Sequence, residues 1–451
     1  MSYPLVNPAT GENMEVIEHV DAEGTDHAIE SARVAQQEWA GATPAERAAM
    51  LRAFAQAVDA DIENLAQLEV RNSGHPIGQA RWEAGHVRDV LNYYAGAPER
   101  LIGKQIPVAG GLDVTFHEPL GVVGIITPWN FPMTIASWGF APALAAGNSV
   151  VLKPAEWTPL TTMRLGELAL EAGIPQGVFH VLPGKGSVVG QRLIESETVR
   201  KVVFTGSTEV GKQIMRQCSD QVKRVTLELG GKSANIVFAD ADVDKAAATA
   251  PSAVFENAGQ DCCARSRILV QAEVFDRFME GLEKSVKAYR VGDPQDEATE
   301  MGPLVTSAHQ KSVESYLEDA EVAFRGNAPE GSGNWFAPAV LLPRSAEDRC
   351  MREEIFGPVV AVYRFTEESE AIEIANATEY GLSGSIWTRD VGRAIRVARG
   401  VESGNLSVNS HSSVRYTTPF GGFKQSGYGR ELGPDAPLHF TEEKNVFISH
   451  D

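Results

Sequence analysis

The chain has 451 residues, of which 43% are hydrophobic and 22% are charged, and its formal net charge at pH 7 is −20. This length predicts two or three domains with a large buried core. Because a strongly negative chain repels phosphate groups, we expect neither nucleic acid nor an anionic membrane surface as a partner.

The first quarter of the chain is expected to be helical. It opens with no basic segment followed by an apolar run, so we expect no secretory or transit peptide. Residues 22–97 have the apolar spacing of helices, and Thr43 followed by Pro44 suits the cap and first turn of one of them. The most apolar stretch, residues 120–147, is interrupted by prolines and predicts a buried strand, turn and helix rather than a membrane span.

An alternation of short apolar runs and helical stretches begins at residue 121. Strands that alternate with helices predict a parallel, doubly wound sheet, which binds ligands at the carboxyl ends of its strands. The expected strands of this series are residues 121–127, 148–153, 178–182, 201–206 and 224–229.

A second α/β series follows from about residue 231 to 430. Residues 234–242 and 266–270 are expected strands, and residues 243–259 and 274–289 are expected helices. Residues 439–449 predict a late strand, and residues 328–335, rich in glycine and polar residues, are the best candidate for an exposed loop.

The four cysteines show neither a disulfide framework nor a zinc-binding spacing, and no two histidines have the HExxH spacing. We therefore expect no metal site and a reducing, cytoplasmic setting. Two of the cysteines, Cys262 and Cys263, are adjacent within "GQDCCARSR", in a predicted loop between a helix and a strand. A thiol there is either an exposed nucleophile or a small buried apolar group.

Polar residues follow several expected strands. Glu228 ends the strand before Gly230, where it is either a general base or a structural carboxylate. Asn130 lies between Pro128 and Pro132, where its amide either donates to an oxyanion or stabilises a turn.

Other strand ends suggest a nucleotide site. Lys153 and Glu156 follow the second strand and suit ribose hydroxyls, and a carboxylate there would repel a 2′-phosphate. Gly206 and Ser207 open a helix whose backbone N–H groups suit a pyrophosphate, although a plain tight turn has the same pattern.

Together these motifs resemble the NAD(P)-dependent aldehyde dehydrogenases. The blocks "PWNFP", "KPAE", "FTGSTEVG", "LELGG", "GQDC", "EEIFGPV" and "PFGGFKQSGYGRELG" occur in the order and spacing of that family, and the resemblance covers essentially the whole chain. It implies a Rossmann-like doubly wound NAD-binding domain, an α/β catalytic domain and a β oligomerisation arm in a homodimer or homotetramer. The implied NAD-binding domain covers residues 1–100 and 120–230, and the catalytic domain covers residues 231–432. The implied arm covers residues 101–119 and 433–451.

The resemblance also implies a hydrolytic, NAD-dependent oxidation of a small aldehyde to an acid. Cys262 is the implied nucleophile, Asn130 and the Cys262 N–H are the oxyanion donors, and Glu228 is the base for water, while Cys263 is structural. Glu156 favours NAD over NADP. The implied cofactor residues are Trp129, Lys153, Glu156, Gly206, Ser207, Glu354 and Phe356.

The residues of the implied substrate tunnel are compatible with more than one class of aldehyde. Asp261 suits an ω-aminoaldehyde such as γ-aminobutyraldehyde, unless it turns to the surface or caps backbone. Arg415 instead suits a semialdehyde acid of the succinate-semialdehyde type. Phe131, Trp138 and Phe420 are expected tunnel walls that suit a broad range of aliphatic aldehydes, or they are plain core residues.

Gly139 departs from the family pattern, and two rival classes of protein are disfavoured. Many hydrolytic relatives have a lysine where this chain has Gly139, in a proton relay near the counterpart of Glu431, and we expect Gly139→Lys to keep activity within about tenfold. A CoA-acylating enzyme is disfavoured by Glu228, and a non-catalytic protein on the same fold is disfavoured because Cys262 and Asn130 are retained.

Overall fold

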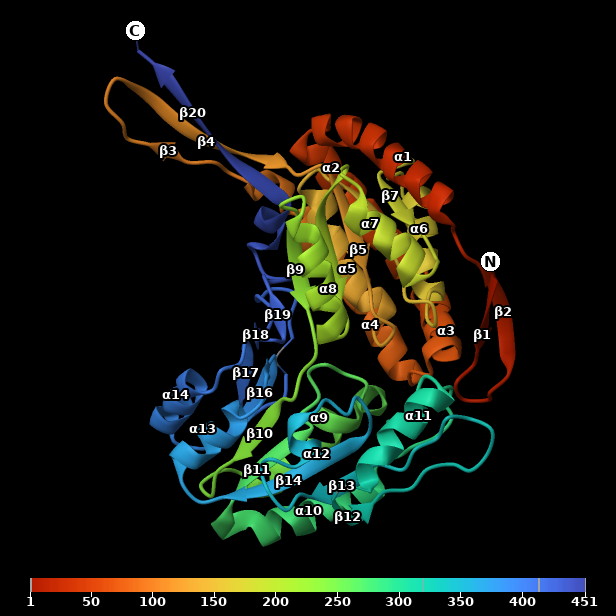
Figure 1. Cartoon of the computed structure of the whole chain (residues 1–451), viewed down its shortest axis with the longest axis vertical. Coiled ribbons are helices and arrows are strands. Elements are labelled where there is room, and N and C mark those ends of the chain that lie inside the picture. The colour runs from red at the N-terminus through yellow and green to blue at the C-terminus, as the bar shows by residue number, and fades with distance from the viewer. Residues whose placement is uncertain (1, 319, 413, 451) are drawn as a thin grey trace.

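The computed structural model describes residues 2–318, 320–412 and 414–450 (Figure 1). Met1, Asp319, Ser413 and Asp451, which fall within the expected domains and arm, lie outside the described residues.

The N-terminal region is a short hairpin followed by helices, as the sequence predicts. Thr43 caps α2 and forms a reciprocal capping box with Glu46, and Pro44 occupies the first turn. The elements are β1 (Ser2–Val6), β2 (Asn13–Glu18), α1 (Ala22–Gly41), α2 (Pro44–Ala60), α3 (Ile62–Ser73), α4 (Ile77–Ala95) and the 3₁₀ turn η1 (Pro98–Arg100).

The first sheet confirms the predicted parallel series. Its order is β19-β9-β8-β5-β6-β7, and all neighbours are parallel except β19, which pairs antiparallel with β9. The strands are β5 (Val122–Ile126), β6 (Ser149–Lys153), β7 (Phe179–Val181), β8 (Val199–Thr205), β9 (Arg224–Glu228) and β19 (Gly427–Tyr428). The helices of this series are α5 (Pro132–Ala145), α6 (Leu160–Glu171), α7 (Gln191–Glu195) and α8 (Thr208–Ser219), with the π-helical turn η2 (Gly186–Gly190) before α7. Because β19 lies within residues 231–432, the segment expected in the catalytic domain completes the first sheet.

The second sheet has seven strands in the order β12-β13-β14-β11-β10-β16-β17, and only β12 is antiparallel to its neighbour. The strands are β10 (Ala234–Val237), β11 (Arg267–Gln271), β12 (Glu321–Arg325), β13 (Ala339–Leu342), β14 (Val359–Phe365), β16 (Ser383–Trp387) and β17 (Asn405–Val408). A small pair, β15 (Tyr380–Gly381) and β18 (Phe423–Lys424), lies outside this sheet. The helices are α9 (Val243–Phe255), α10 (Phe275–Ala288), α11 (Ser307–Glu314), α12 (Arg349–Arg352), α13 (Glu368–Asn376) and α14 (Val391–Gly400). Short 3₁₀ turns are η3 (Glu256–Gly259), η4 (Ala272–Val274), η5 (Ser315–Leu317) and η6 (Ala436–Phe440).

Helix α9 is shorter than the predicted helix over residues 243–259. It ends at Phe255, because Asn257 and Ala258 have positive φ angles of 49° and 54° and Gly259 follows at 70°. A run of left-handed residues cannot continue a right-handed helix. The chain therefore turns sharply and delivers residues 260–263 as a loop.

A three-stranded antiparallel sheet, in the order β20-β4-β3, forms a separate arm. It consists of β3 (Gln105–Ile106), β4 (Gly111–Pro119) and β20 (Thr441–Ser449), and Figure 1 shows it reaching well beyond the body of the molecule. Exposed apolar side chains, such as Phe116 and Phe447, lie along it.

The structure accounts for the apolar stretch 120–147 and for the irregular segment 328–335. All residues of α5 are buried, which accounts for the apolar stretch 120–147, and no helix in the described ranges is long and apolar enough to cross a membrane. Residues 328–335 are irregular as expected, but they are fastened to the N-terminal hairpin: the Asn334 N–H donates to the Pro8 carbonyl at 2.9 Å.

Candidate active site

The adjacent thiols lie in the loop that joins α9 to β11. Cys262 is half-buried, whereas Cys263 is buried. Cys262 lines two different pockets, one formed by the ends of the first sheet and one lined by helices α4, α5 and α9 and the loops beside them. It is therefore the point at which two bound molecules would meet.

The first pocket, of about 560 Å³, contains every residue that the sequence suggests for the cofactor. It lies at the carboxyl ends of β5, β6, β8 and β9, where parallel sheets bind ligands. The proposed cofactor residues that line it are Trp129, Lys153, Glu156, Gly206, Ser207, Glu354 and Phe356.

One half of this pocket suits the adenosine and phosphate part of a dinucleotide. Lys153 is buried, its Nζ donates to the Pro154 carbonyl at 2.7 Å, and burial lowers its pKa to about 8. The Glu156 Oε1 accepts from the Gly186 N–H at 3.2 Å. Ser207 caps α8, so the first N–H groups of that helix face the pocket beside Gly206.

The other half lies closer to Cys262. The Glu354 Oε1 accepts from the Gly231 N–H at 2.8 Å, and burial raises the pKa of Glu354 to about 7. A Cβ atom on Gly230 would lie only 2.5 Å from Glu354 Oε2, so the glycine allows this approach. Phe356 packs edge-to-face on Trp129 with ring centroids 5.3 Å apart. The pocket therefore fits a dinucleotide whose redox end reaches the thiol.

The second pocket, of about 350 Å³, is the candidate substrate cavity. The structure brings four of the five predicted tunnel residues to it, namely Phe131, Trp138, Asp261 and Phe420. Arg415, the fifth, lines an adjoining pocket that shares Trp82 and Val414 with the cavity.

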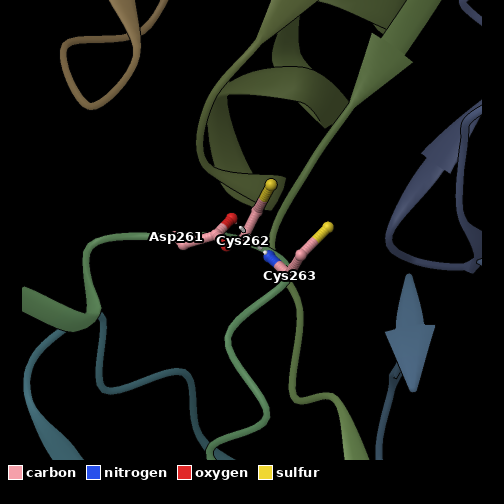
Figure 2. Close-up of side chains that lie close together, drawn as sticks. All are labelled: Asp261, Cys262 and Cys263. Carbon is pink, nitrogen blue, oxygen red and sulfur yellow. Dashed lines mark hydrogen bonds between the residues drawn. The ribbon is translucent and has the colours of Figure 1, made fainter. Parts of the chain in front are cut away.

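Asp261 bonds to the backbone of its own loop and also lines the cavity. Its Oδ1 accepts from the Cys263 N–H at 2.8 Å, which confirms the backbone-capping interpretation, and Figure 2 shows this bond within the Asp261–Cys263 loop. The residue also lines the cavity, so it is not simply turned to the surface. Burial raises the pKa of Asp261.

The surroundings of the Cys262 thiol favour its neutral form. Hydrogen bonding to Cys263, burial, and the nearby charges of Cys263 and Asp261 raise its pKa well above the usual range. A general base or the positive charge of a bound cofactor is therefore needed to favour the nucleophilic thiolate.

Asn130 is buried beside the thiol loop and firmly held. Its side-chain Nδ2 donates to the backbone carbonyl of Gln260 at 2.9 Å. Its backbone carbonyl accepts from the Asn257 Nδ2 at 2.7 Å. One N–H of the amide is used by Gln260, which leaves the second available to an oxyanion formed at Cys262.

Glu228 ends β9, as predicted, but its carboxylate lies off both pockets. The residue is buried, and neither oxygen accepts a hydrogen bond within residues 2–318, 320–412 and 414–450. Burial and the charge of Glu431 raise its pKa well above the usual range. To reach a substrate at Cys262 the side chain must rotate.

Gly139, at the position where many hydrolytic relatives have a lysine, lies in the buried helix α5. Burial raises the pKa of Glu431 to about 7, and the cation that opposes this shift is Lys201 of β8. Lys201 is itself buried, and its Nζ donates to the His439 carbonyl at 2.9 Å.

The cavity also contains residues that the sequence did not mark as candidates, among them Trp82, Glu256, Arg265 and His411. Glu256 directly precedes the thiol loop, which is a signal that could have found it. Arg265 donates to the Cys263 carbonyl and to Ser385 Oγ, so its charge is engaged in holding the loop. Trp82 and His411 come from distant elements, and no local pattern marks them.

Comparison with known proteins places these features in context. A family model described as "Aldehyde dehydrogenase family" matches residues 1–446. A betaine aldehyde dehydrogenase of Bacillus subtilis is 39% identical over 98% of this chain and 93% of its own. A solved NAD⁺ complex of an aldehyde dehydrogenase from Bacillus cereus has a TM-score of 0.97 at 39% identity, covering 100% of this chain and 94% of that one. An E. coli structure described as an NADP-dependent enzyme has a TM-score of 0.97 at 37% identity, with coverages of 100% and 95%.

Proposed function

This chain belongs to the aldehyde dehydrogenase family, and we propose that it uses NAD to oxidise an ω-aminoaldehyde, such as γ-aminobutyraldehyde, to the carboxylic acid. The observation that carries the choice of substrate is the pair of carboxyl groups, Glu256 and Asp261, that line the cavity next to Cys262.

The site residues suit a two-stage reaction. The Cys262 thiolate attacks the aldehyde carbon, and the new oxyanion receives hydrogen bonds from the Asn130 amide and the Cys262 N–H. NAD, when bound, supplies the hydride acceptor, and the carbon is left as a thioester of Cys262. Glu228, after rotating toward the thioester, takes a proton from water, and hydroxide addition releases the acid and the thiolate. The overall change is aldehyde, NAD⁺ and water to acid, NADH and a proton.

NAD is favoured over NADP by the position of Glu156. Lys153 and Glu156 would hold the adenosine ribose, the N-terminus of α8 at Ser207 the pyrophosphate, and Glu354 the nicotinamide ribose. A carboxylate at Glu156 repels a 2′-phosphate, yet the similarity to an enzyme described as NADP-dependent leaves activity with NADP open to measurement.

The cavity has the chemistry of a site for a cation. Although the Glu256 side chain is open to the cavity, burial and the charge of Asp261 raise its pKa to about 7. A bound ammonium group would favour the ionised form of both carboxyls. Trp82, which is 59% exposed, lines the same cavity, and an indole ring is a suitable cation–π partner for an ammonium group. Arg415 lines the adjoining pocket instead, which weakens the case for a semialdehyde acid.

The test is a comparison of kcat/KM for NADH formation with γ-aminobutyraldehyde, betaine aldehyde, succinic semialdehyde and hexanal. We expect the two cationic aldehydes to be preferred, and Glu256→Gln and Asp261→Asn each to lower that preference about tenfold, which corresponds to one screened charge. Arg415→Gln is the matched control and should not change it. A preference for hexanal would leave a broad-range enzyme, and a preference for succinic semialdehyde would contradict the role of the carboxyl pair.

The arm supports assembly with a second copy. Its exposed apolar side chains and the free edges of its strands are suited to burial against another subunit, so we propose a homodimer or homotetramer. The molar mass in solution tests this. We also propose a cytoplasmic, reducing setting, because Cys262 must stay a free thiol to act.

Two alternative functions on the same fold can be tested with the same protein. A CoA-acylating enzyme would form an acyl-CoA in the presence of CoA, whereas Glu228 suits hydrolysis. A non-catalytic protein would bind NAD without forming NADH from any aldehyde.

A further inference from the structure

A cluster of buried ionisable residues lies beneath the turn that carries Asn130. Glu69 comes from the last turn of α3, His75 from the connection between α3 and α4, and Glu83 from α4. All three are at most 2% exposed. The His75 Nδ1 lies 2.7 Å from Glu83 Oε1 and 3.8 Å from Glu69 Oε1, and Glu69 Oε2 accepts from Thr161 Oγ1 at 2.8 Å. None of them lines the cofactor pocket or the substrate cavity.

The charges in this cluster define which atoms donate. Burial lowers the pKa of His75, but the charge and hydrogen bond of Glu83, the charge of Glu69 and the backbone of Asn130 raise it to about 9. His75 is therefore an imidazolium at neutral pH, and both of its ring nitrogens are donors. The 2.7 Å distance from Nδ1 to Glu83 is that of a direct, charge-assisted hydrogen bond.

The other side of the ring faces the catalytic turn. The His75 ring packs against Phe131, the neighbour of Asn130, with centroids 5.5 Å apart. The backbone of Asn130 also acts on His75 and raises its pKa, as an acceptor does, so the group involved is the carbonyl. Because Nδ1 serves Glu83 and the ring packs on Phe131, we assign this contact to Nε2–H. The same carbonyl accepts from Asn257 Nδ2 at 2.7 Å, so the peptide is held from two elements.

We propose that His75 is a positioning residue: anchored by Glu83, it fixes the carbonyl of Asn130 and so aims the Asn130 amide at the oxyanion formed on Cys262. The inference rests on the proposed function, because it assumes that Asn130 is an oxyanion donor. Glu69 lies 3.8 Å from the same Nδ1, and burial raises its pKa to about 7.

Two substitutions at one position separate the two ring nitrogens. His75→Asn keeps a donor near the Nδ1 position and loses the one that faces Asn130, whereas His75→Gln keeps a donor near the Nε2 position. We expect His75→Asn to lower kcat by about 10- to 100-fold without changing the Kd for NAD, because small misplacements of a catalytic group have costs of this size. His75→Gln should recover most of the loss. Equal losses in both variants would overturn the proposal in favour of a purely structural role.

A double-mutant cycle tests the route of the effect. In an Asn130→Ala background, His75→Asn should lower kcat by no more than about twofold, because the amide that it positions is gone. Independent, multiplying losses would overturn the proposal. If neither His75 variant folds, Glu83→Gln takes their place: it keeps an acceptor for Nδ1 but removes the charged anchor, and an unchanged kcat would contradict the inference.

A control and the wild-type enzyme complete the design. His180 is a half-buried histidine on β7 that contacts Ser31 at 3.2 Å, far in sequence from the thiol loop, and His180→Asn should leave kcat within about twofold. Failure of the wild-type protein to oxidise any aldehyde would contradict the proposed function. An active enzyme that depends on Asn130 but tolerates His75→Asn would contradict only the present inference.

Discussion

The side-chain amide of Asn130 donates to the carbonyl of Gln260, 2.9 Å away and two residues before Cys262. This bond ties the end of β5, in the first sheet, to the loop that leads into the second sheet. The oxyanion donor and the nucleophile therefore keep a fixed relation, although 132 residues separate them in the sequence.

Asn130→Ala removes both the donor and this tie. We expect kcat to fall by about 10² to 10³, the range found when one oxyanion donor is lost, with little change in the Kd for NAD. Steady-state rates and fluorescence titration with NAD measure the two quantities, and a thermal unfolding scan shows whether the variant is folded. A folded variant with undiminished kcat would exclude Asn130 from the oxyanion site.

The adjacent thiols should behave very differently. We expect Cys262→Ser to lower kcat by at least about 10³, since a serine hydroxyl is a far weaker nucleophile at this pH. Cys263→Ser should retain activity within about tenfold, because Cys263 is buried in a hydrophobic cluster and lines the substrate cavity but not the cofactor pocket. Alkylation by iodoacetamide, located by mass spectrometry, should modify Cys262 first. Preferential labelling of Cys263 would reverse the assignment.

The cofactor-side residues were predictable because parallel strands end at one edge. Lys153 ends one strand of the alternating series and Gly206 directly follows another, and the structure places both strand ends at that edge. The residues of the substrate cavity were less predictable. Trp82 comes from α4 and Arg415 from a long irregular segment, and only the tertiary packing decides that one reaches the cavity and the other an adjoining pocket.

Backbone conformation and packing also set limits to sequence reasoning. The helix over residues 243–259 stops at Phe255 because Asn257 and Ala258 adopt positive φ. Asn tolerates this region, but Ala seldom adopts it, so the residue types alone did not predict the end of the helix. The expectation for Gly139→Lys needs an addition: a Cβ there would lie 3.0 Å from Ile125 Cδ1, inside a buried helix. Such overpacking costs about 1 to 3 kcal/mol of stability, so the activity must be compared per folded molecule.

The choice between NAD and NADP should depend on Glu156. Its carboxylate lies in the cofactor pocket beside Lys153, where it opposes a 2′-phosphate. We expect Glu156→Gln to raise the ratio of kcat/KM for NADP to that for NAD by at least about tenfold, because one like-charge repulsion is removed. Initial rates at several concentrations of each cofactor measure the ratio. Glu209→Gln, an exposed carboxylate in the first turn of α8, is the control for general charge effects. An unchanged ratio in Glu156→Gln would place the selectivity elsewhere.

Glu228 should lower the stability of the folded protein at neutral and alkaline pH. Its pKa is raised by burial and by Glu431, so between the ordinary carboxyl pKa and the raised value the folded state binds more protons than the unfolded state. Stability is therefore lost as the pH rises through this window. We expect Glu228→Gln to raise Tm relative to wild type, and the gain to be larger at pH 8 than at pH 5. A Tm difference that is the same at both pH values would contradict a raised pKa for Glu228.

The pH dependence of thioester hydrolysis should also report the interaction between the carboxyls of Glu228 and Glu431. Glu228 acts as a base only when ionised, so its raised pKa moves the acid limb of the deacylation rate above the ordinary carboxyl range. Glu431→Gln removes the second cause of that shift, and the acid limb should move to lower pH while burial keeps it above that range. Rapid-mixing measurements of the burst and steady phases of NADH formation give the deacylation rate at each pH. Glu280→Gln, an exposed carboxylate on α10, should leave the profile unchanged. If Glu431→Gln also left it unchanged, Glu431 would have no electrostatic influence on the base, and the acid limb would belong to another group.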